Sequence, residues 1–293
     1  MKIWSIIFRS IQKKDFLMRH ERIYLNESDD RVYIDTYVVN DGKVHPAMLV
    51  IPGGGYCSVC TEREGEPIGL EFVFKGYNAF VLNYRVGKGD CFPSQLIDAG
   101  SAMIYIRKHA EEFKVDPKRV FAVGFSAGGH LCGSIATMFD YPEVKAVFGD
   151  DYKKVRPTGA ILSYPVTVMH GPSHFGSFIN LLGKQPSEFT EAELDKFSLE
   201  RVVAKQPDAA PMFIWHTLTD ELVPVQGTLM LARALADAKL PYQMAIYPYG
   251  PHGLALSTWA TAVPGADNTV QPIAAAWTAD ADVWMRTLPD YEC

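Results

Sequence analysis

Residues 119–131 contain the pentapeptide Gly124-Phe125-Ser126-Ala127-Gly128, which fits the pattern G-x-S-x-G. The pattern is short, and its context gives it weight: an apolar run at 120–123 precedes it, and a segment rich in small residues follows it. A serine on a sharp strand-to-helix turn presents its hydroxyl beside the free N–H groups at the start of the helix. We therefore predict that Ser126 is a nucleophile. The alternative is a glycine-rich turn with an incidental serine.

A serine hydroxyl is a weak nucleophile at neutral pH and needs a base, which in turn needs an orienting acid. On strand–turn–helix folds of this kind, these residues follow the serine in the order acid, then histidine. Asp220 comes just after the strand-like run 212–215, and His252 lies in a turn-rich segment after the last expected strand. We predict that His252 moves the proton while Asp220 orients its ring and stabilises its cation.

Several neighbouring residues offer alternative interpretations. Glu221 is a rival for the acid, although adjacent side chains point in different directions. Among the other histidines, we expect His216 and His130 to be structural, because the first ends a strand and the second sits within a helix. His170 and His174 could line a pocket.

A second glycine-rich segment, Pro52-Gly53-Gly54-Gly55-Tyr56, follows an early apolar run. Glycine lets the backbone approach a ligand closely and turn its N–H groups toward it. Acyl transfer needs such donors for the negative oxygen of the tetrahedral intermediate, together with the N–H of the residue after the nucleophile. We predict an oxyanion hole formed by Gly54, Gly55 and Ala127.

Three aromatic residues lie next to these motifs in the sequence. Tyr56 follows the glycine segment, Phe125 precedes the serine, and Tyr164 follows an expected strand. Their positions lead us to expect that all three border the substrate.

Elements of two kinds alternate along the chain. Strands are expected at 22–25, 31–39, 47–51, 79–84, 119–123, 158–163, 212–215 and 242–247, and helices at 66–75, 95–113, 127–138, 226–238 and 271–286. Continuous apolar runs between turn residues are typical of strands buried on both faces. The alternation predicts an α/β fold with a doubly wound, mostly parallel sheet, an antiparallel edge at the N-terminal side, and one domain over residues 1–293.

Residues 165–210 interrupt this rhythm after the sixth strand. A connection of that length is usually functional, and it carries a helical stretch at 191–204. We predict a cap or lid over the carboxyl end of the sheet.

The composition excludes some classes of protein. Hydrophobic residues make up 48% and charged residues 21% of the chain, which are ordinary values for a globular protein. The net charge is −6, and the absence of a basic block argues against nucleic acid as a partner.

The cysteines and the N-terminus give further expectations. The five cysteines are too sparse for a disulfide framework, and Cys57-x-x-Cys60 has no second pair with zinc spacing, so we expect no metal. The apolar run at residues 3–8 is too short for a signal peptide and no stretch approaches a membrane span. We expect a cytoplasmic protein without membrane association, whose N-terminal segment packs on the body.

Together these motifs resemble the α/β-hydrolase superfamily, in particular its esterase and lipase group with acetyl esterases and feruloyl- or acetylxylan-type esterases. The matching segments are Pro52-Gly53-Gly54-Gly55-Tyr56, Asn83-Tyr84-Arg85, Leu96-x-Asp98-Ala99, Asp116-Pro117-x-Arg119-Val120, Gly124-Phe125-Ser126-Ala127-Gly128-Gly129-His130-Leu131, Tyr164-Pro165-Val166, Asp220-x-x-Val223-Pro224 and His252-Gly253-Leu254. The resemblance implies the α/β-hydrolase fold and hydrolysis of carboxylic esters through an acyl-serine intermediate, with no cofactor. One branch of the group carries His-Gly-Gly-Gly, and here Pro52 replaces that histidine.

The main functional hypothesis is a serine carboxylesterase acting on small or short-acyl esters, with acetylated or aromatic-acylated sugars among the candidate substrates. An amidase or peptidase with the same three residues is an alternative, and a catalytically silent binding protein is another. An edge strand or the cap could also form a homodimer.

Overall fold

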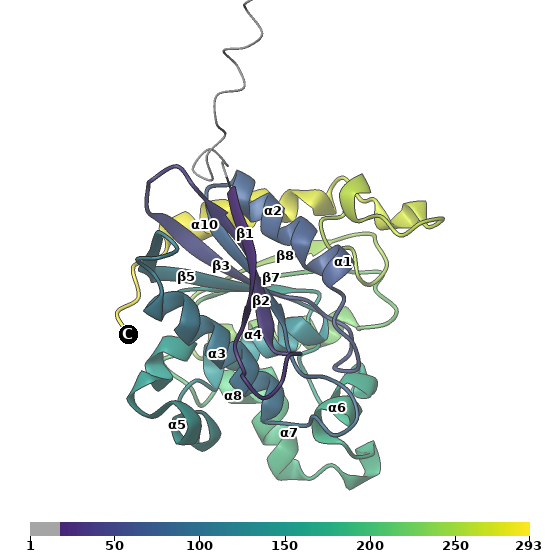
Figure 1. Cartoon of the computed structure of the whole chain (residues 1–293). Coiled ribbons are helices and arrows are strands. Elements are labelled where there is room, and N and C mark those ends of the chain that lie inside the picture. Colours follow the sequence, from purple (N-terminus) through teal and green to yellow (C-terminus); the bar gives the residue numbers. More distant parts are fainter. Residues whose placement is uncertain (1–17) are drawn as a thin grey trace, which may run out of the picture.

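The computed structural model describes residues 18–293, and within them one eight-stranded sheet runs through the molecule (Figure 1). The strands are β1 (Met18–Tyr24), β2 (Tyr33–Val39), β3 (His45–Ile51), β4 (Asn78–Asn83), β5 (Val115–Phe125), β6 (Ala160–Ser163), β7 (Met212–Thr217) and β8 (Tyr242–Tyr247). Their spatial order is β1-β2-β4-β3-β5-β6-β7-β8. The pairs that involve β2 are antiparallel, and every other pair is parallel. The predicted fold class is confirmed.

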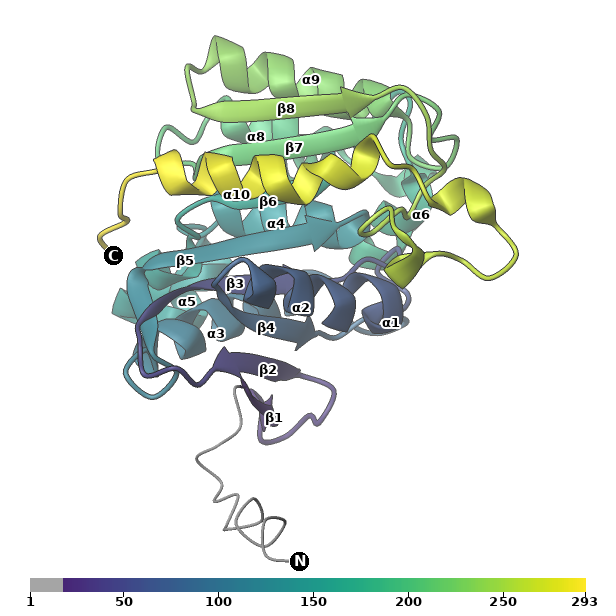
Figure 2. The ribbon, with the colours of Figure 1, turned by 90° about the horizontal axis from the view of Figure 1, so that it is seen from above.

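Helices cover both faces of this sheet (Figure 2). They are α1 (Thr61–Glu64), α2 (Glu66–Phe74), α3 (Ser94–Lys108), α4 (Ala127–Thr137), α5 (Pro142–Phe148), α6 (Phe175–Leu182), α7 (Glu191–Phe197), α8 (Leu199–Val203), α9 (Val225–Asp237) and α10 (Trp277–Thr287). Short 3-10 turns are η1 (Gly149–Val155), η2 (Pro186–Glu188), η3 (Trp259–Thr261), η4 (Asp267–Thr269) and η5 (Ala274–Ala276). Helices α2 and α10 pack on one face, and α3, α4 and α9 pack on the other.

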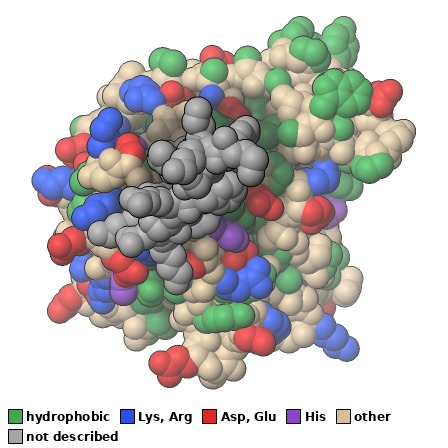
Figure 3. Space-filling model, turned by 45° about the horizontal axis from the view of Figure 1, so that its top comes forward, with side chains coloured by type: hydrophobic (Ala, Val, Ile, Leu, Met, Phe, Trp, Pro, Cys, Tyr) green, Lys and Arg blue, Asp and Glu red, His purple; other side chains and the backbone are tan. Residues whose placement is uncertain are grey.

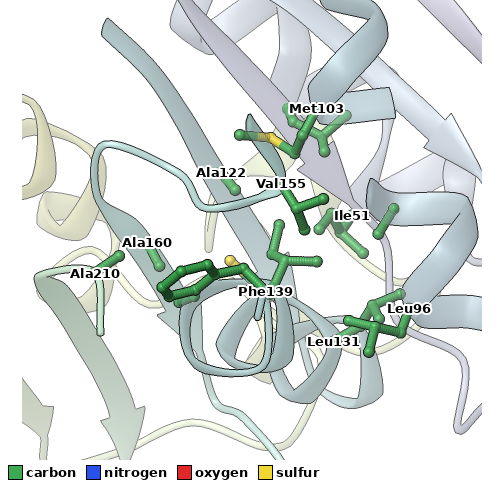
Figure 4. Packing of buried hydrophobic residues seen from close by; sticks show 14 of the residues in the cluster. Ile51, Leu96, Met103, Ala122, Leu131, Phe139, Val155, Ala160 and Ala210 are labelled. Atoms are coloured by element: carbon green, nitrogen blue, oxygen red, sulfur yellow. The ribbon is translucent and has the colours of Figure 1, made fainter. Parts of the chain in front are cut away.

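The core follows from the apolar runs in the central strands, whose side chains are buried on both faces. On the α4 face, Ile51, Leu131 and Met103 belong to one continuous cluster (Figure 4). On the α10 face the core is richer in aromatic rings, and Trp215 stacks on Trp277 with 5.3 Å between ring centroids. Burying both faces of a parallel sheet fixes the strand ends, from which the loops of the site extend.

Two expected elements differ from the structure near their ends. The strand expected at 119–123 already begins at Val115, and its pairing with β3 shifts register between His45 and Ala47. The helix expected at 271–286 begins only at Trp277. The residues before it form the short turn η5, and Gln271 is tied to Ser257, whose carbonyl accepts its N–H and whose hydroxyl donates to its carbonyl.

The insertion after β6 serves two purposes. Helix α6 lies at the carboxyl end of the sheet, where the Asn180 amide donates to the Gly55 carbonyl at 2.8 Å. Helix α8 instead packs against α4 and α9 on the face of the sheet. The expected helix at 191–204 is broken at Ser198, whose backbone is extended and whose hydroxyl accepts the N–H of Met169. The expectation of a lid over the whole of 165–210 is therefore corrected to its α6 part.

His130, on α4, links this insertion to the rest of the molecule. Its Nε2–H donates to the Phe197 carbonyl, and the Tyr56 hydroxyl donates to its Nδ1, each at 2.8 Å. Complete burial lowers the pKa of His130 to about 4, so the ring is neutral in the folded protein near neutral pH. The expectation that His130 is structural agrees with these contacts.

The first 17 residues lie outside this description, and so does the expected packing of the N-terminal segment on the body. Across residues 18–293, every helix is too short or too polar to cross a bilayer.

The close packing of α4 against the end of β3 predicts a large loss of stability for Gly128→Ala. A Cβ at Gly128 would lie 2.3 Å from the Ile51 carbonyl oxygen and 2.4 Å from that of Pro52. These are backbone atoms that cannot rotate away, so overpacking outweighs the better helix propensity of alanine. We expect a loss of roughly 2–3 kcal/mol in the free energy of unfolding, measured by urea denaturation.

Gly69→Ala on α2 is the matched control. There the nearest atom to the new methyl would be a side-chain methyl of Val81 at 3.3 Å, and we expect a change within about 1 kcal/mol. Equal stabilities of the Gly128 variant and the wild type would refute this close packing of α4.

Acidification should destabilise the protein through His130. Its pKa of about 4 in the folded chain lies below the ordinary 6.5, so the unfolded chain takes up the proton first as the pH falls. We expect this residue to remove roughly 2–3 kcal/mol from the free energy of unfolding between about pH 7 and about pH 4.5, measured by urea denaturation.

His130→Gln supplies the comparison, because its side chain does not titrate. The variant should start less stable and lose less over the same pH interval. If both proteins lost the same amount, His130 would not be the group responsible.

Candidate active site

Ser126 occupies the turn between β5 and α4 in a backbone conformation rare for a residue with a side chain, φ 54° and ψ −118°. Its N–H donates to the Ser163 carbonyl at 3.0 Å, which ties the turn to the neighbouring strand β6. The turn can close because Gly124 has no side chain: a Cβ there would lie 2.1 Å from the Gly128 carbonyl oxygen. The serine thus stands on the strand–turn–helix geometry that its sequence predicts.

Loops from three parallel strands bring the expected catalytic residues together. The Ser126 hydroxyl lies 2.8 Å from Nε2 of His252, and Nδ1 of that ring lies 2.7 Å from Oδ2 of Asp220. Ser126 follows β5, Asp220 follows β7 and His252 follows β8. In this arrangement Nδ1–H donates to the carboxylate, which leaves Nε2 free to accept the serine proton.

Asp220 is held as a buried carboxylate. Its Oδ1 accepts the N–H groups of Leu222 and Val223, at 3.0 and 2.9 Å. Burial opposes its ionisation, but hydrogen bonds from His216 and His252 outweigh burial and hold its pKa well below the usual range. The rival acid Glu221 is exposed, and its side chain lines a cleft instead.

His216 contributes more to the site than its sequence position indicates. Its Nε2 lies 3.1 Å from Oδ2 of Asp220 and 3.0 Å from the Val223 carbonyl. Both are acceptors, so Nε2 carries the hydrogen, and Nδ1 accepts the Thr228 hydroxyl at 2.8 Å. A second imidazole thus supports the acid. Its spacing of four residues from Asp220 was a signal, although only the structure shows that the two side chains meet.

Residues Thr217 and Thr219 tie the loop of His252 to the end of β7. Both hydroxyls donate to the Gly250 carbonyl, and the Gly250 N–H is within hydrogen-bonding distance of the Thr219 hydroxyl. These contacts fix the loops of the acid and the base against one another.

The glycine segment after β3 presents unused backbone donors. Gly54 and Gly55 have positive φ values of 127° and 63°, and a Cβ on Gly54 would lie 2.2 Å from the Ser58 carbonyl oxygen. The N–H groups of Gly54, Gly55 and Ala127 have no protein acceptor within residues 18–293. Free N–H groups next to the serine are what an oxyanion requires.

The expectation for the three aromatic residues is corrected. Tyr56, Phe125 and Tyr164 are all buried, with at most 2% of their surface exposed. Phe125 packs against Trp277 on the α10 face, because side chains alternate along β5, while Tyr56 binds His130. Tyr164 lies within the protein beside His252, with 5.1 Å between ring centroids.

The two histidines of the insertion have different surroundings. Nε2 of His170 lies 2.7 Å from a carboxylate oxygen of Glu200. His174 lies beside the glycine segment, with its Cε1 3.9 Å from the point where Gly55 would carry a Cβ. Burial, and then the charge of His252, lower the pKa of His174. Of the two, His174 is therefore the one near the triad.

A cleft of about 550 Å³ opens beside His252. Its lining residues are Thr219, Glu221, Leu222, Tyr249, Gly250, Pro251, His252, Asn268 and Gln271. Six of them come from the segment between β8 and α10, which projects beyond the ends of the strands (Figure 2). Hydrophobic side chains gather on a projecting lobe at the upper right of Figure 3, and Trp259 of this segment is 73% exposed.

The five cysteines carry free thiols, including Cys57 and Cys60. No cluster of three or more His, Cys, Asp or Glu side chains with metal-binding geometry occurs in the described part of the chain.

Comparison with known proteins places this geometry in a family. The BD-FAE family model matches residues 34–235. The chain is 41% identical over 229 residues to endo-1,4-beta-xylanase B of Butyrivibrio fibrisolvens, covering 75% of this chain and 34% of the relative. It is 31% identical over 242 residues to an acetylxylan esterase of Xylanibacter ruminicola, covering 82% and 47%. It thus spans a third to a half of the length of these curated relatives.

Solved structures agree over nearly the whole chain. An acetyl ester-xyloside bifunctional hydrolase from Caldicellulosiruptor lactoaceticus superposes with a TM-score of 0.79 at 31% identity, covering 93% of this chain and 98% of that one. A carboxylesterase from Lactobacillus plantarum superposes with a TM-score of 0.77 at 28% identity, covering 92% and 97%. The chain belongs to the BD-FAE family of α/β-hydrolase esterases.

Proposed function

We propose that this protein is a serine carboxylesterase that removes short acyl groups from carbohydrate esters. The observation that carries the proposal is the hydrogen-bonded chain from Ser126 through His252 to Asp220, beside free backbone donors. These are the parts that acyl transfer needs: a nucleophile, a base with an orienting acid, and an oxyanion hole.

In the first half of the reaction, the Ser126 oxygen attacks the ester carbonyl while its proton passes to Nε2 of His252. The carbonyl oxygen becomes an oxyanion that accepts N–H groups from Gly54, Gly55 and Ala127. The C–O bond to the alcohol then breaks, and Nε2 gives its proton to the departing oxygen. Water repeats the sequence on the acyl-serine, releasing the carboxylic acid and restoring the serine.

The cleft beside His252 suits a hydrophilic leaving group. Since His252 protonates the departing oxygen, the alcohol lies on its side of the serine. The cleft offers Asn268 and Gln271, whose amide side chains exchange hydrogen bonds with hydroxyl groups. It also offers the ring of Tyr249, which is 67% exposed and presents an apolar face with a polar tip.

We expect the acyl group to lie on the side of the glycine segment, where the Tyr56 side chain is buried against His130. Helix α6 adds further contacts at that end through Asn180. The names of the relatives that act on acetyl esters support the same assignment.

The test compares hydrolysis of p-nitrophenyl acetate, butyrate and octanoate, methyl ferulate and acetylated xylo-oligosaccharides. We expect the acetyl esters to be fastest and Ser126→Ala to lose activity by roughly 10⁴-fold or more, because the nucleophile is gone. Tyr249→Ala should raise KM for the acetylated oligosaccharide several-fold.

Tyr242→Ala is the control for Tyr249, because Tyr242 is exposed on β8 and does not line the cleft. Equal KM values for the two variants would refute the sugar site. Faster cleavage of p-nitroanilides than of matching esters would instead make the protein an amidase, and an inert folded protein would indicate a binding role.

A further inference from the structure

A buried carboxylate that the reaction does not use lies behind the glycine segment. Glu64, the last residue of α1, is 5% exposed. Its Oε2 accepts the N–H of Gly53 at 2.8 Å, and its Oε1 accepts the hydroxyl of Tyr164 at 2.7 Å. The neighbouring Arg63 does not pair with it: that guanidinium donates to the carbonyls of Gly253 and Thr261.

The first of these bonds fixes the glycine segment. Gly53 precedes the two expected oxyanion donors, and it presses directly on the nucleophile turn. A Cβ on Gly53 would lie 2.6 Å from the Phe125 carbonyl oxygen and 3.0 Å from the Ser126 Cβ. Glu64 holds the Gly53 N–H, and the next two N–H groups, of Gly54 and Gly55, have no protein acceptor within residues 18–293.

The second bond reaches the loop of the base. The Tyr164 hydroxyl donates to Glu64 and accepts the N–H of Ala255 at 2.9 Å. Ala255 lies three residues after His252, and the Tyr164 ring packs edge-on against the His252 ring. Glu64 therefore connects the oxyanion donors to the catalytic histidine through a single tyrosine.

The negative charge of Glu64 also acts on His252. Both of its oxygens accept hydrogen bonds, as a carboxylate does. Burial raises the pKa of Glu64, while the bonds from Tyr164 and Gly53, and then the positive charges of His252 and Arg63, act against burial. This coupling is mutual, since a carboxylate that gains from the imidazolium form of His252 also favours that form.

Few other titratable groups in the described part of the chain surround Glu64 and His252. Asp220 and Tyr164 contact His252 directly, and His174 of the insertion couples to it electrostatically. Glu64 is also within electrostatic reach of Cys60 and Tyr84.

We propose that Glu64 is a positioning residue that holds the oxyanion loop and the His252 loop in one frame and supplies negative charge that favours the imidazolium form of His252. The proposal rests on the serine mechanism of the proposed function, but not on the identity of the ester.

The test uses diethyl p-nitrophenyl phosphate, which reports on the triad whatever the natural substrate is. The serine oxygen forms a bond to phosphorus, the bond to p-nitrophenolate breaks, and the serine proton passes to His252. The release rate of p-nitrophenolate is measured from about pH 5 to pH 9 for the wild type and Glu64→Gln. Glu62→Gln is the control, because Glu62 is exposed on the same helix.

We expect Glu64→Gln to react roughly 10- to 100-fold more slowly near pH 8, and the control to match the wild type. The acid limb of the pH–rate profile of Glu64→Gln should move to lower pH, because a carboxylate that favours the imidazolium form of His252 is gone. If the acid limb, the low-pH side of the profile, stayed at the wild-type pH, the proposal would be overturned even if the rate fell. A purely structural role would lower the rate without moving that limb.

Tyr164→Phe keeps the test decisive if Glu64→Gln does not fold. It removes the hydroxyl that links Glu64 to the His252 loop and leaves the ring on His252 and the carboxylate of Glu64 in place. The rate should therefore fall roughly 10-fold while the acid limb stays at the wild-type pH. A wild-type rate for this variant would overturn the proposal. Failure of the proposed function looks different: the wild type would then release p-nitrophenolate from the phosphate ester but leave carboxylic esters intact.

Discussion

The strained turn at Ser126 is the constraint on which the rest of the site depends. A side-chain-bearing residue at φ 54° costs of order 1–3 kcal/mol and persists only where its surroundings enforce it. Here β5 and β6 enforce it from one side, through the hydrogen bond to the Ser163 carbonyl, and α4 enforces it from the other. The glycines on both sides of the serine remove the atoms that would prevent this close packing.

The mostly parallel sheet turns this local strain into a usable geometry. Because the carboxyl ends of parallel strands share one edge, the loops after β3, β5, β7 and β8 meet there. Each loop carries one part of the proposed mechanism: oxyanion donors, nucleophile, acid and base. Cross-links between loops, such as the threonine hydroxyls on Gly250 and the Glu64–Tyr164 pair, then set the relative positions of these parts.

The sequence was sufficient where chemistry and chain order coincide. The pattern around Ser126 has few structural solutions, and the order of Asp220 and His252 after their strands left little choice of partner. The direction in which a side chain points was harder to predict. Phe125 adjoins the nucleophile in sequence, yet the alternation of side chains along β5 sends its ring into the α10 face of the core.

Tertiary contacts were beyond sequence reasoning. Glu64 belongs to no motif, and the spacing of His216 from Asp220 does not show that their side chains meet. Both contacts arise from burial beside residues that are distant in the chain or on an adjoining loop. The same holds for the insertion after β6, where periodicity indicated one helix but Ser198 interrupts it and sends α8 onto the sheet face. Such features depend on where chain segments meet, which local pattern does not encode.

The most direct test of the central claim is mass spectrometry of the enzyme quenched with acid during turnover of p-nitrophenyl acetate. The mechanism predicts one acetyl group per chain on the peptide that contains Ser126, present only while substrate remains. Steady turnover with no acetyl group on that serine, or with the acetyl group on another residue, would contradict it.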